Sequence, residues 1–213
     1  MDHQLSDFFR ICEKYRKYII KINIKDEVYY FVCGITKDYQ DKILLDKDNK
    51  ILFFTEQKLI FEYLKENNPY WDKNEFKLWI DEASSFLLNQ DKNMLLSNVY
   101  ASIDINRIRL LFVDIDNIEA LSYDSVSIRE CLLFLNFLFE YGTQVNDKEL
   151  TEYRNSDDID ILYEFFYDFK FWEAPEVDKR ELIERIERQW NELEFKETLS
   201  FLIETFFTKI RIY

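Results

Sequence analysis

Apolar and polar residues alternate with a period of two in the first quarter of the chain. Residues 18–25 place Tyr18, Ile20 and Ile22 on one side of an extended segment, and residues 28–35 repeat the pattern after an Asp26-Glu27 turn. Period two is typical of half-buried strands. Residues 43–45 and 50–54 flank a polar turn in the same way. We therefore expect about four antiparallel strands here, arranged as two hairpins.

Elsewhere apolar residues recur at every third or fourth position, which predicts amphipathic helices. The predicted helices cover residues 5–17, 55–64, 74–87, 107–121, 157–170, 178–193 and 195–209. Segment 107–121 also fits a shorter strand, Leu110 to Ile115, although the helical pattern holds at every step. Residues 94–102 fit either a helix or an extended segment.

The longest apolar stretch lies between Ser127 and Gly142. Ser127 and Glu130 match a capping box, and Gly142 suits the left-handed position after a helix end. Asn136 is the one polar residue between Cys131 and Phe139. A helix this apolar is predicted to be covered on every side, and it is too short to cross a bilayer. Asn136 would be a packed core amide or, less commonly, a specificity device.

These elements predict an α+β fold: a small antiparallel sheet near the N-terminus, followed by a mostly helical array. The Asn67-Asn68-Pro69 sequence predicts a break, because the residue before proline avoids the helical region. We expect an α+β subdomain over residues 1–68 and a helical subdomain over 69–213, joined as one globular unit. At 47% hydrophobic residues, the 213-residue chain has ample material for a core.

Negative charge is concentrated in one third of the chain. The net charge is −14, and residues 110–178 contain 17 acidic against 4 basic residues. A concentrated field of one sign attracts and selects partners of the opposite sign. Here acidic residues alternate with tyrosines, a mixture suited to binding a basic protein. The candidate partner-binding residues are Asp147, Glu149, Glu152, Tyr153, Asp157, Asp158, Asp160, Tyr163, Glu164, Tyr167 and Asp168. A solvated helix face with its tyrosines in the core is the alternative for each of them.

Several kinds of catalytic site lack the residues they need. His3 is the single histidine, and the two glycines, Gly34 and Gly142, cannot form a phosphate-binding loop. Three scattered cysteines fit neither a disulfide framework nor a zinc site: Cys12, Cys33 and Cys131. The polar N-terminus has no signal-peptide pattern, so we expect a cytoplasmic protein without a cofactor.

Asp114 and Asp116 are the best candidates for metal chemistry. They follow an apolar run, as do the acidic pairs that bind Mg²⁺ at strand ends in haloacid-dehalogenase-type phosphatases and some nucleases. The Gly and Thr of such a phosphatase are replaced by Asn117 and Ile118. On a helix the two carboxylates would lie about 200° apart and could not share an ion. Solvated acids are therefore the preferred interpretation.

Two stretches resemble bacterial immunity proteins that neutralise polymorphic toxins, including those of contact-dependent inhibition. One runs from Ile51 to Leu64, and the other from Leu110 to Ile115 leads into the helical half. Several such proteins have a Trp-Asn-Leu-Phe-x-Asp-Ile-like segment, in which Arg109-Leu110 replace Trp-Asn here. The resemblance implies a protein that binds a toxin in the cytoplasm and blocks its active site.

The sequence thus favours a non-catalytic immunity protein whose acidic surface binds a basic, nuclease-type toxin, since nuclease grooves are positive. A DNA mimic that inhibits a DNA-binding enzyme is one alternative. A metal-dependent phosphatase or nuclease using Asp114 and Asp116 is another. The toxin's identity and the oligomeric state stay open.

Overall fold

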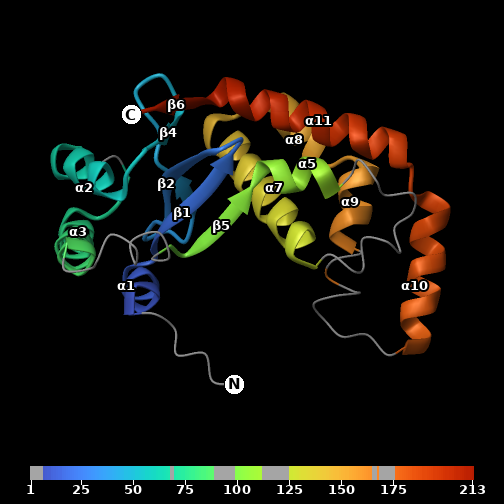
Figure 1. Ribbon diagram of the computed structural model, residues 1–213, viewed down its shortest axis with the longest axis horizontal. Helices are drawn as coiled ribbons and strands as arrows, with labels where there is room; N and C mark the ends of the chain where they lie inside the picture. Colours follow the sequence, from blue (N-terminus) through green and yellow to red (C-terminus); the bar gives the residue numbers. More distant parts are fainter. Residues whose placement is uncertain (1–6, 68–69, 89–98, 112–124, 165–166, 168–175) are drawn as a thin grey trace. The chain divides into compact units, whose positions relative to one another are not determined.

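The computed structural model describes residues 7–67, 70–88, 99–111, 125–164, 167 and 176–213 (Figure 1). By their contacts, the residues fall into two compact units. Unit 1 comprises Met1–Ile103 and Lys209–Tyr213, and unit 2 comprises Asp104–Thr208. The division thus follows Ile103, whereas the sequence placed a break near residue 68. No described helix is long and apolar enough to cross a membrane.

Unit 1 contains the predicted small sheet. Strands β1 (Lys17–Ile24) and β2 (Glu27–Ile35) pair antiparallel along their full length, from Lys17 opposite Gly34 to Ile24 opposite Glu27. Strand β3 (Asp41–Ile43) pairs with β2, and β5 (Ala101–Asp104) lies beside β1 (Figure 1). This four-stranded sheet and the helices that follow confirm the α+β prediction. Its fourth strand, β5, overlaps only the last two residues of segment 94–102, whose type the sequence left open.

The second predicted hairpin is short but present: Leu45 and Ile51 form an antiparallel bridge, and the Leu52 N–H donates to the Leu44 carbonyl oxygen at 3.1 Å. Strand β4 (Ile51–Phe53) has a second partner that the sequence did not predict. It forms a parallel pair with β6 (Ile210–Ile212), more than 150 residues further along the chain. Two parallel strands need a long connection between them, so no local turn pattern in the sequence predicts such a pair.

Helices complete the core of unit 1. They are α1 (Asp7–Tyr15), α2 (Gln57–Glu66) and α3 (Lys73–Leu88). Helix α1 buries its predicted face, including Phe8 and Cys12, and Trp79 of α3 is fully buried in the same cluster. Asp72 caps α3 by accepting the backbone N–H of Glu75 at 3.1 Å.

Lys17 is a buried cation in unit 1. The Lys17 ammonium donates to the Tyr15 carbonyl oxygen at 2.7 Å and pairs with Glu75 Oε1 at 3.3 Å. A Cβ atom added at Gly34 would lie 2.8 Å from Lys17 Cδ and 2.7 Å from the Arg16 carbonyl oxygen. Glycine is therefore required at position 34 so that β2 can pass over the buried lysine.

The described part of unit 2 is helical: α5 (Ile105–Leu111), α7 (Ser125–Val145), α8 (Lys148–Arg154), α9 (Asp157–Glu164), α10 (Glu176–Gln189) and α11 (Glu192–Lys209). Helix α5 confirms a helical start to segment 107–121, and residues 112–121 lie outside the described part. Phe134 of α7 meets Phe206 of α11 edge to face, with ring centroids 5.3 Å apart. Aromatic contacts of this kind join the two longest helices of the unit.

Helix α7 continues past its predicted end. Gly142 lies inside the helix, and Asn146 takes the left-handed conformation with φ of 56°. Gly142 serves packing instead: a Cβ atom at this position would lie 2.8 Å from Leu150 Cβ on α8. Glycine therefore permits a close approach of two helices rather than ending one.

The prediction that α7 is covered on every side is also wrong. Cys131, Phe134 and Leu138 are fully buried, but Arg129 and Asn136 are exposed. These two lie seven residues apart and thus on one face of the helix. The Asn136 side chain is therefore not a core amide: its Oδ1 accepts a hydrogen bond from the Tyr163 hydroxyl at 2.6 Å.

Candidate protein-binding surface

Helix α8 carries the first acidic residues of the predicted surface. Asp147 has a local structural task, because its Oδ1 accepts the Leu150 backbone N–H at 3.3 Å and caps the helix. Glu149 and Glu152 are exposed and lie three residues apart, so their carboxylates share one face of α8. Leu150 faces the other way and is fully buried.

Helix α9 divides its three aspartates in the same manner. Asp157 and Asp160 are exposed and again lie three residues apart. Asp158 is only 8% exposed, and its Oδ2 accepts a hydrogen bond from Thr198 Oγ1 at 3.2 Å. Burial, together with the nearby Glu194, raises the pKa of Asp158 above its ordinary value. Asp158 therefore belongs to the packing between α9 and α11.

The tyrosines take part in packing and leave some area exposed. Tyr153 stacks on Phe201, with ring centroids 4.7 Å apart. Tyr163 donates to Asn136 and stacks on Tyr167 at 6.1 Å, and burial raises the pKa of the Tyr163 hydroxyl. Tyr167 is 40% exposed. The Tyr163–Tyr167 pair thus offers aromatic surface next to the acidic helices.

Ion pairs within unit 2 neutralise several other acids. Glu164 pairs with Arg185, Glu140 with Arg154 at 3.9 Å, and Glu130 with Arg107 at 3.0 Å. Two of these arginines, Arg107 and Arg185, lie outside the acidic third of the sequence. Negative charge in this region is therefore smaller than the sequence count suggests.

Four exposed carboxylates of the candidate surface have no ion-pair partner among the residues that the structure describes. They form what we call the acidic strip: Glu149, Glu152, Asp157 and Asp160. The strip occupies two consecutive short helices joined by Asn155 and Ser156. Each helix contributes one pair of adjacent carboxylates.

Other candidate residues lie outside the described part of the chain. These are His3, Asp114, Asp116 and Asp168. Within the described residues, no group of three or more histidine, cysteine, aspartate or glutamate side chains could hold a metal ion. Burial raises the pKa of the Cys12 and Cys33 thiols to about 12, so both stay protonated at neutral pH.

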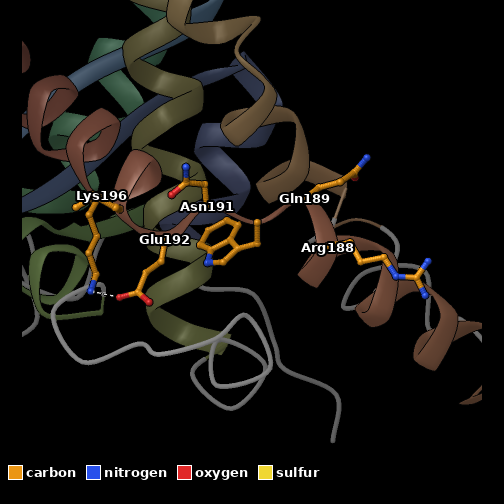
Figure 2. A pocket seen from close by; sticks show the side chains of 7 residues that line it. Arg188, Gln189, Asn191, Glu192 and Lys196 are labelled. Carbon is orange, nitrogen blue, oxygen red and sulfur yellow. Dashed lines mark hydrogen bonds and ion pairs between the residues drawn. The ribbon is translucent and has the colours of Figure 1, made fainter.

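A hollow of about 570 Å³ at the junction of α10 and α11 was not predicted from the sequence (Figure 2). It is lined by Arg188, Gln189, Trp190, Asn191, Glu192, Leu193 and Lys196. Figure 2 shows the Lys196 and Glu192 side chains directed toward each other, and they form an ion pair. The Trp190 ring packs against Phe195 at 4.7 Å. The helical pattern predicted over residues 178–193 passes through Trp190 and Asn191, so it did not indicate the break between α10 and α11 that forms this hollow.

The elements together define an α+β protein with a sheet-containing unit and a helical unit. In comparisons with known proteins, no family model and no curated protein matches the chain. Among solved structures, the chain resembles the SatS C-terminal domain, whose crystal structure was determined in complex with bromine, with a TM-score of 0.61. The match covers 95% of this chain and 96% of that one at 12% sequence identity. The likeness is one of fold.

Proposed function

We propose that the chain is a non-catalytic binding protein that uses the acidic strip to bind a basic protein. The observation that carries this proposal is the contrast among neighbouring acids. Asp147 caps a helix, Asp158 is buried and Glu164 is paired, whereas the four carboxylates of the strip are exposed without such partners. Unneutralised carboxylates repel one another, and a cationic partner relieves that repulsion.

The surroundings of the strip suit a protein partner. Exposed Tyr167, stacked on Tyr163, adds rigid aromatic area of the kind enriched in interfaces. The charged strip would accelerate encounter with a basic surface, and the rings would slow dissociation. Carboxylates beside aromatic rings fit lysine- and arginine-rich protein surfaces well.

The partner under this proposal is a basic, nuclease-type toxin domain, and the chain is its cytoplasmic immunity protein. A nuclease groove is positive because it holds phosphates, so a carboxylate strip can occupy it. The sequence resemblance to immunity proteins supports this role. By occupying the groove, the strip would exclude the nucleic acid substrate.

Neutralising the strip tests the proposal. The variant combines Glu149→Gln, Glu152→Gln, Asp157→Asn and Asp160→Asn. The matched control removes the same charge from four exposed acids of unit 1, through Glu62→Gln, Glu66→Gln, Asp38→Asn and Asp81→Asn. The partner to be used in the test is a basic terminal domain of a secreted protein, sought in the reading frames next to the gene for this chain.

We expect the strip variant to associate at least roughly tenfold more slowly than wild type at low salt, and the control to lose much less. Rising ionic strength should remove most of the difference, because salt screens exposed charges. Equal effects of the two variants, or an association rate indifferent to salt, would contradict the proposal. Protection of cells that produce the toxin domain provides the functional readout.

A further inference from the structure

Within unit 1, the C-terminal strand is bound to β4 through its backbone. Strand β6 runs parallel to β4, with Ile51 opposite Ile210 and Phe53 opposite Ile212 (Figure 1). The Tyr213 N–H donates to the Phe53 carbonyl oxygen at 2.7 Å. On its other side β4 is already paired, since the Phe54 N–H donates to the Tyr30 carbonyl oxygen at 2.8 Å. Strand β6 therefore covers the second edge of β4.

An acidic turn clamps the side chain of Arg211. Arg211 Nη1 lies 2.5 Å from Asp46 Oδ2 and 2.9 Å from Asp48 Oδ2. The hydrogen bond to Asp48, together with the charges of Asp46 and Asp48, raises the pKa of Arg211, so the clamp holds its cation at any physiological pH. The strand thus has a specific charged contact in addition to its backbone pairing.

The acidic turn is built by contacts that do not involve the strand. Asp46 Oδ1 accepts the backbone N–H groups of Asp48 at 2.7 Å and Lys50 at 2.9 Å. Asn49 has φ of 60°, which closes the turn, and its N–H donates to the Asp46 carbonyl oxygen. One oxygen of Asp46 therefore organises the turn, while the other is held toward Arg211. The site is preorganised.

The end of the strand rests on two aromatic rings. The Tyr213 ring centroid lies 5.2 Å from that of Tyr63 and 5.4 Å from that of Phe54. Yet Ile212 and Tyr213 are each 53% exposed, whereas Phe53 of β4 is fully buried. The end of the strand therefore lies on the surface of the buried core, as a bound peptide does, and its last two side chains are not part of that core.

We propose that the edge of β4, with the 46–50 turn and the rings of Phe54 and Tyr63, is a strand-addition site for a partner protein. Its ligand is an extended segment with a basic residue between two β-branched apolar residues, followed by an aromatic residue. Residues Ile210–Tyr213 occupy this site within the chain, and a matching segment of the partner displaces them. Such addition of a strand to a sheet edge is a common mode of peptide recognition.

Fluorescence anisotropy with a labelled peptide, Lys-Ile-Arg-Ile-Tyr, tests this assignment directly. One protein is the chain shortened to end at Lys209, and a second is the full-length chain with Arg211→Ala and Tyr213→Ala. We expect both to bind the peptide saturably. The intact chain should bind at least roughly tenfold more weakly, because its own strand leaves the site open in only a small fraction of molecules.

Charge exchange gives the specificity control. Asp48 is exposed, so Asp48→Lys leaves the Asp46-centred turn intact while opposing an arginine in the ligand. In the Arg211→Ala/Tyr213→Ala background, Asp48→Lys should lower the affinity for the arginine peptide. It should raise the affinity for the peptide Lys-Ile-Glu-Ile-Tyr, compared with the same protein that retains Asp48. A peptide preference unchanged by Asp48→Lys would overturn the assigned ligand class.

Two further results would overturn the proposal. One is the absence of saturable binding to the Arg211→Ala/Tyr213→Ala chain while its thermal unfolding stays cooperative; this chain also decides the matter if the shortened one fails to fold. The other is equal affinity of the intact and altered chains. A concentration-dependent dimer of the intact chain that Arg211→Ala abolishes would assign the site to a second copy and overturn a foreign partner.

Discussion

Replacing Gly142 with alanine sets two opposing effects of known size against each other. Inside a helix, alanine is favoured over glycine by roughly 0.5–1 kcal/mol because glycine loses more backbone freedom. At this position the new Cβ atom would lie 2.8 Å from Leu150 Cβ and 3.2 Å from Leu150 Cδ1. The Cδ1 atom can rotate away, but Cβ is fixed to the backbone of α8, so that helix must move.

Overpacking of this kind costs roughly 1–3 kcal/mol, which exceeds the gain in helix propensity. We therefore expect Gly142→Ala to lower the free energy of unfolding by about 1 kcal/mol, because the two ranges differ by about 0–2.5 kcal/mol. Urea titration followed by circular dichroism measures it. Leu150→Ala in the same chain should give little relief, because alanine keeps the Cβ atom that clashes.

Exposed Arg129 on the same helix supplies the matched control. There Arg129→Ala should be more stable than Arg129→Gly by roughly 0.5–1 kcal/mol, the propensity effect without the clash. If Gly142→Ala stabilises the chain by the amount separating the two Arg129 variants, the packing argument at Gly142 is refuted. Full relief of the Gly142→Ala defect by Leu150→Ala would likewise refute the fixed-Cβ reasoning.

Three further predictions concern buried charges. Arg107→Ala removes the partner that lies 3.0 Å from the buried Glu130 carboxylate, and should lower the free energy of unfolding by about 1–3 kcal/mol, as measured by urea titration. Adding Glu130→Gln should reduce that loss, because the unpaired buried charge is then removed. Burial raises the pKa of Asp158 in the native state, so on acidification the native state binds a proton at a higher pH than the unfolded chain does. The free energy of unfolding therefore falls as pH rises from 3.8 through the raised value. Asp158→Asn should remove that fall in thermal unfolding measured against pH, and a parallel profile would contradict the assignment. Burial outweighs Glu75 and lowers the pKa of Lys17, so its unfavourable contribution is present below that value and disappears as pH rises to 10.5. The Lys17→Met variant should gain less stability over this pH interval than wild type does. An equal gain in the two proteins would show that Lys17 is not its source.

Local periodicity was enough to predict the elements whose partners are near in sequence. The β1–β2 hairpin and the buried face of α1 follow from patterns of two and of three to four residues. The β4–β6 pair could not be predicted in this way, because its two strands are more than 150 residues apart and no turn joins them. For α7, the recurrence of Arg129 and Asn136 after seven residues was an available sign of an exposed face.

The candidate surface was predicted in part, for similar reasons. Asp147 could have been recognised as a cap, since it immediately precedes a short helical segment. The burial of Asp158 depends on Thr198, forty positions further along, which no local pattern reveals. Whether the acidic strip binds a basic protein stays a prediction.

The discontinuity of unit 1 has a consequence for its synthesis. Ile103 leaves the ribosome well before Lys209, and at ordinary translation rates the interval is roughly 5–20 s. Throughout that time the nascent sheet-containing unit lacks the strand that borders β4. Chaperones or neighbouring nascent chains can therefore encounter this sheet border before residues 209–213 emerge to cover it.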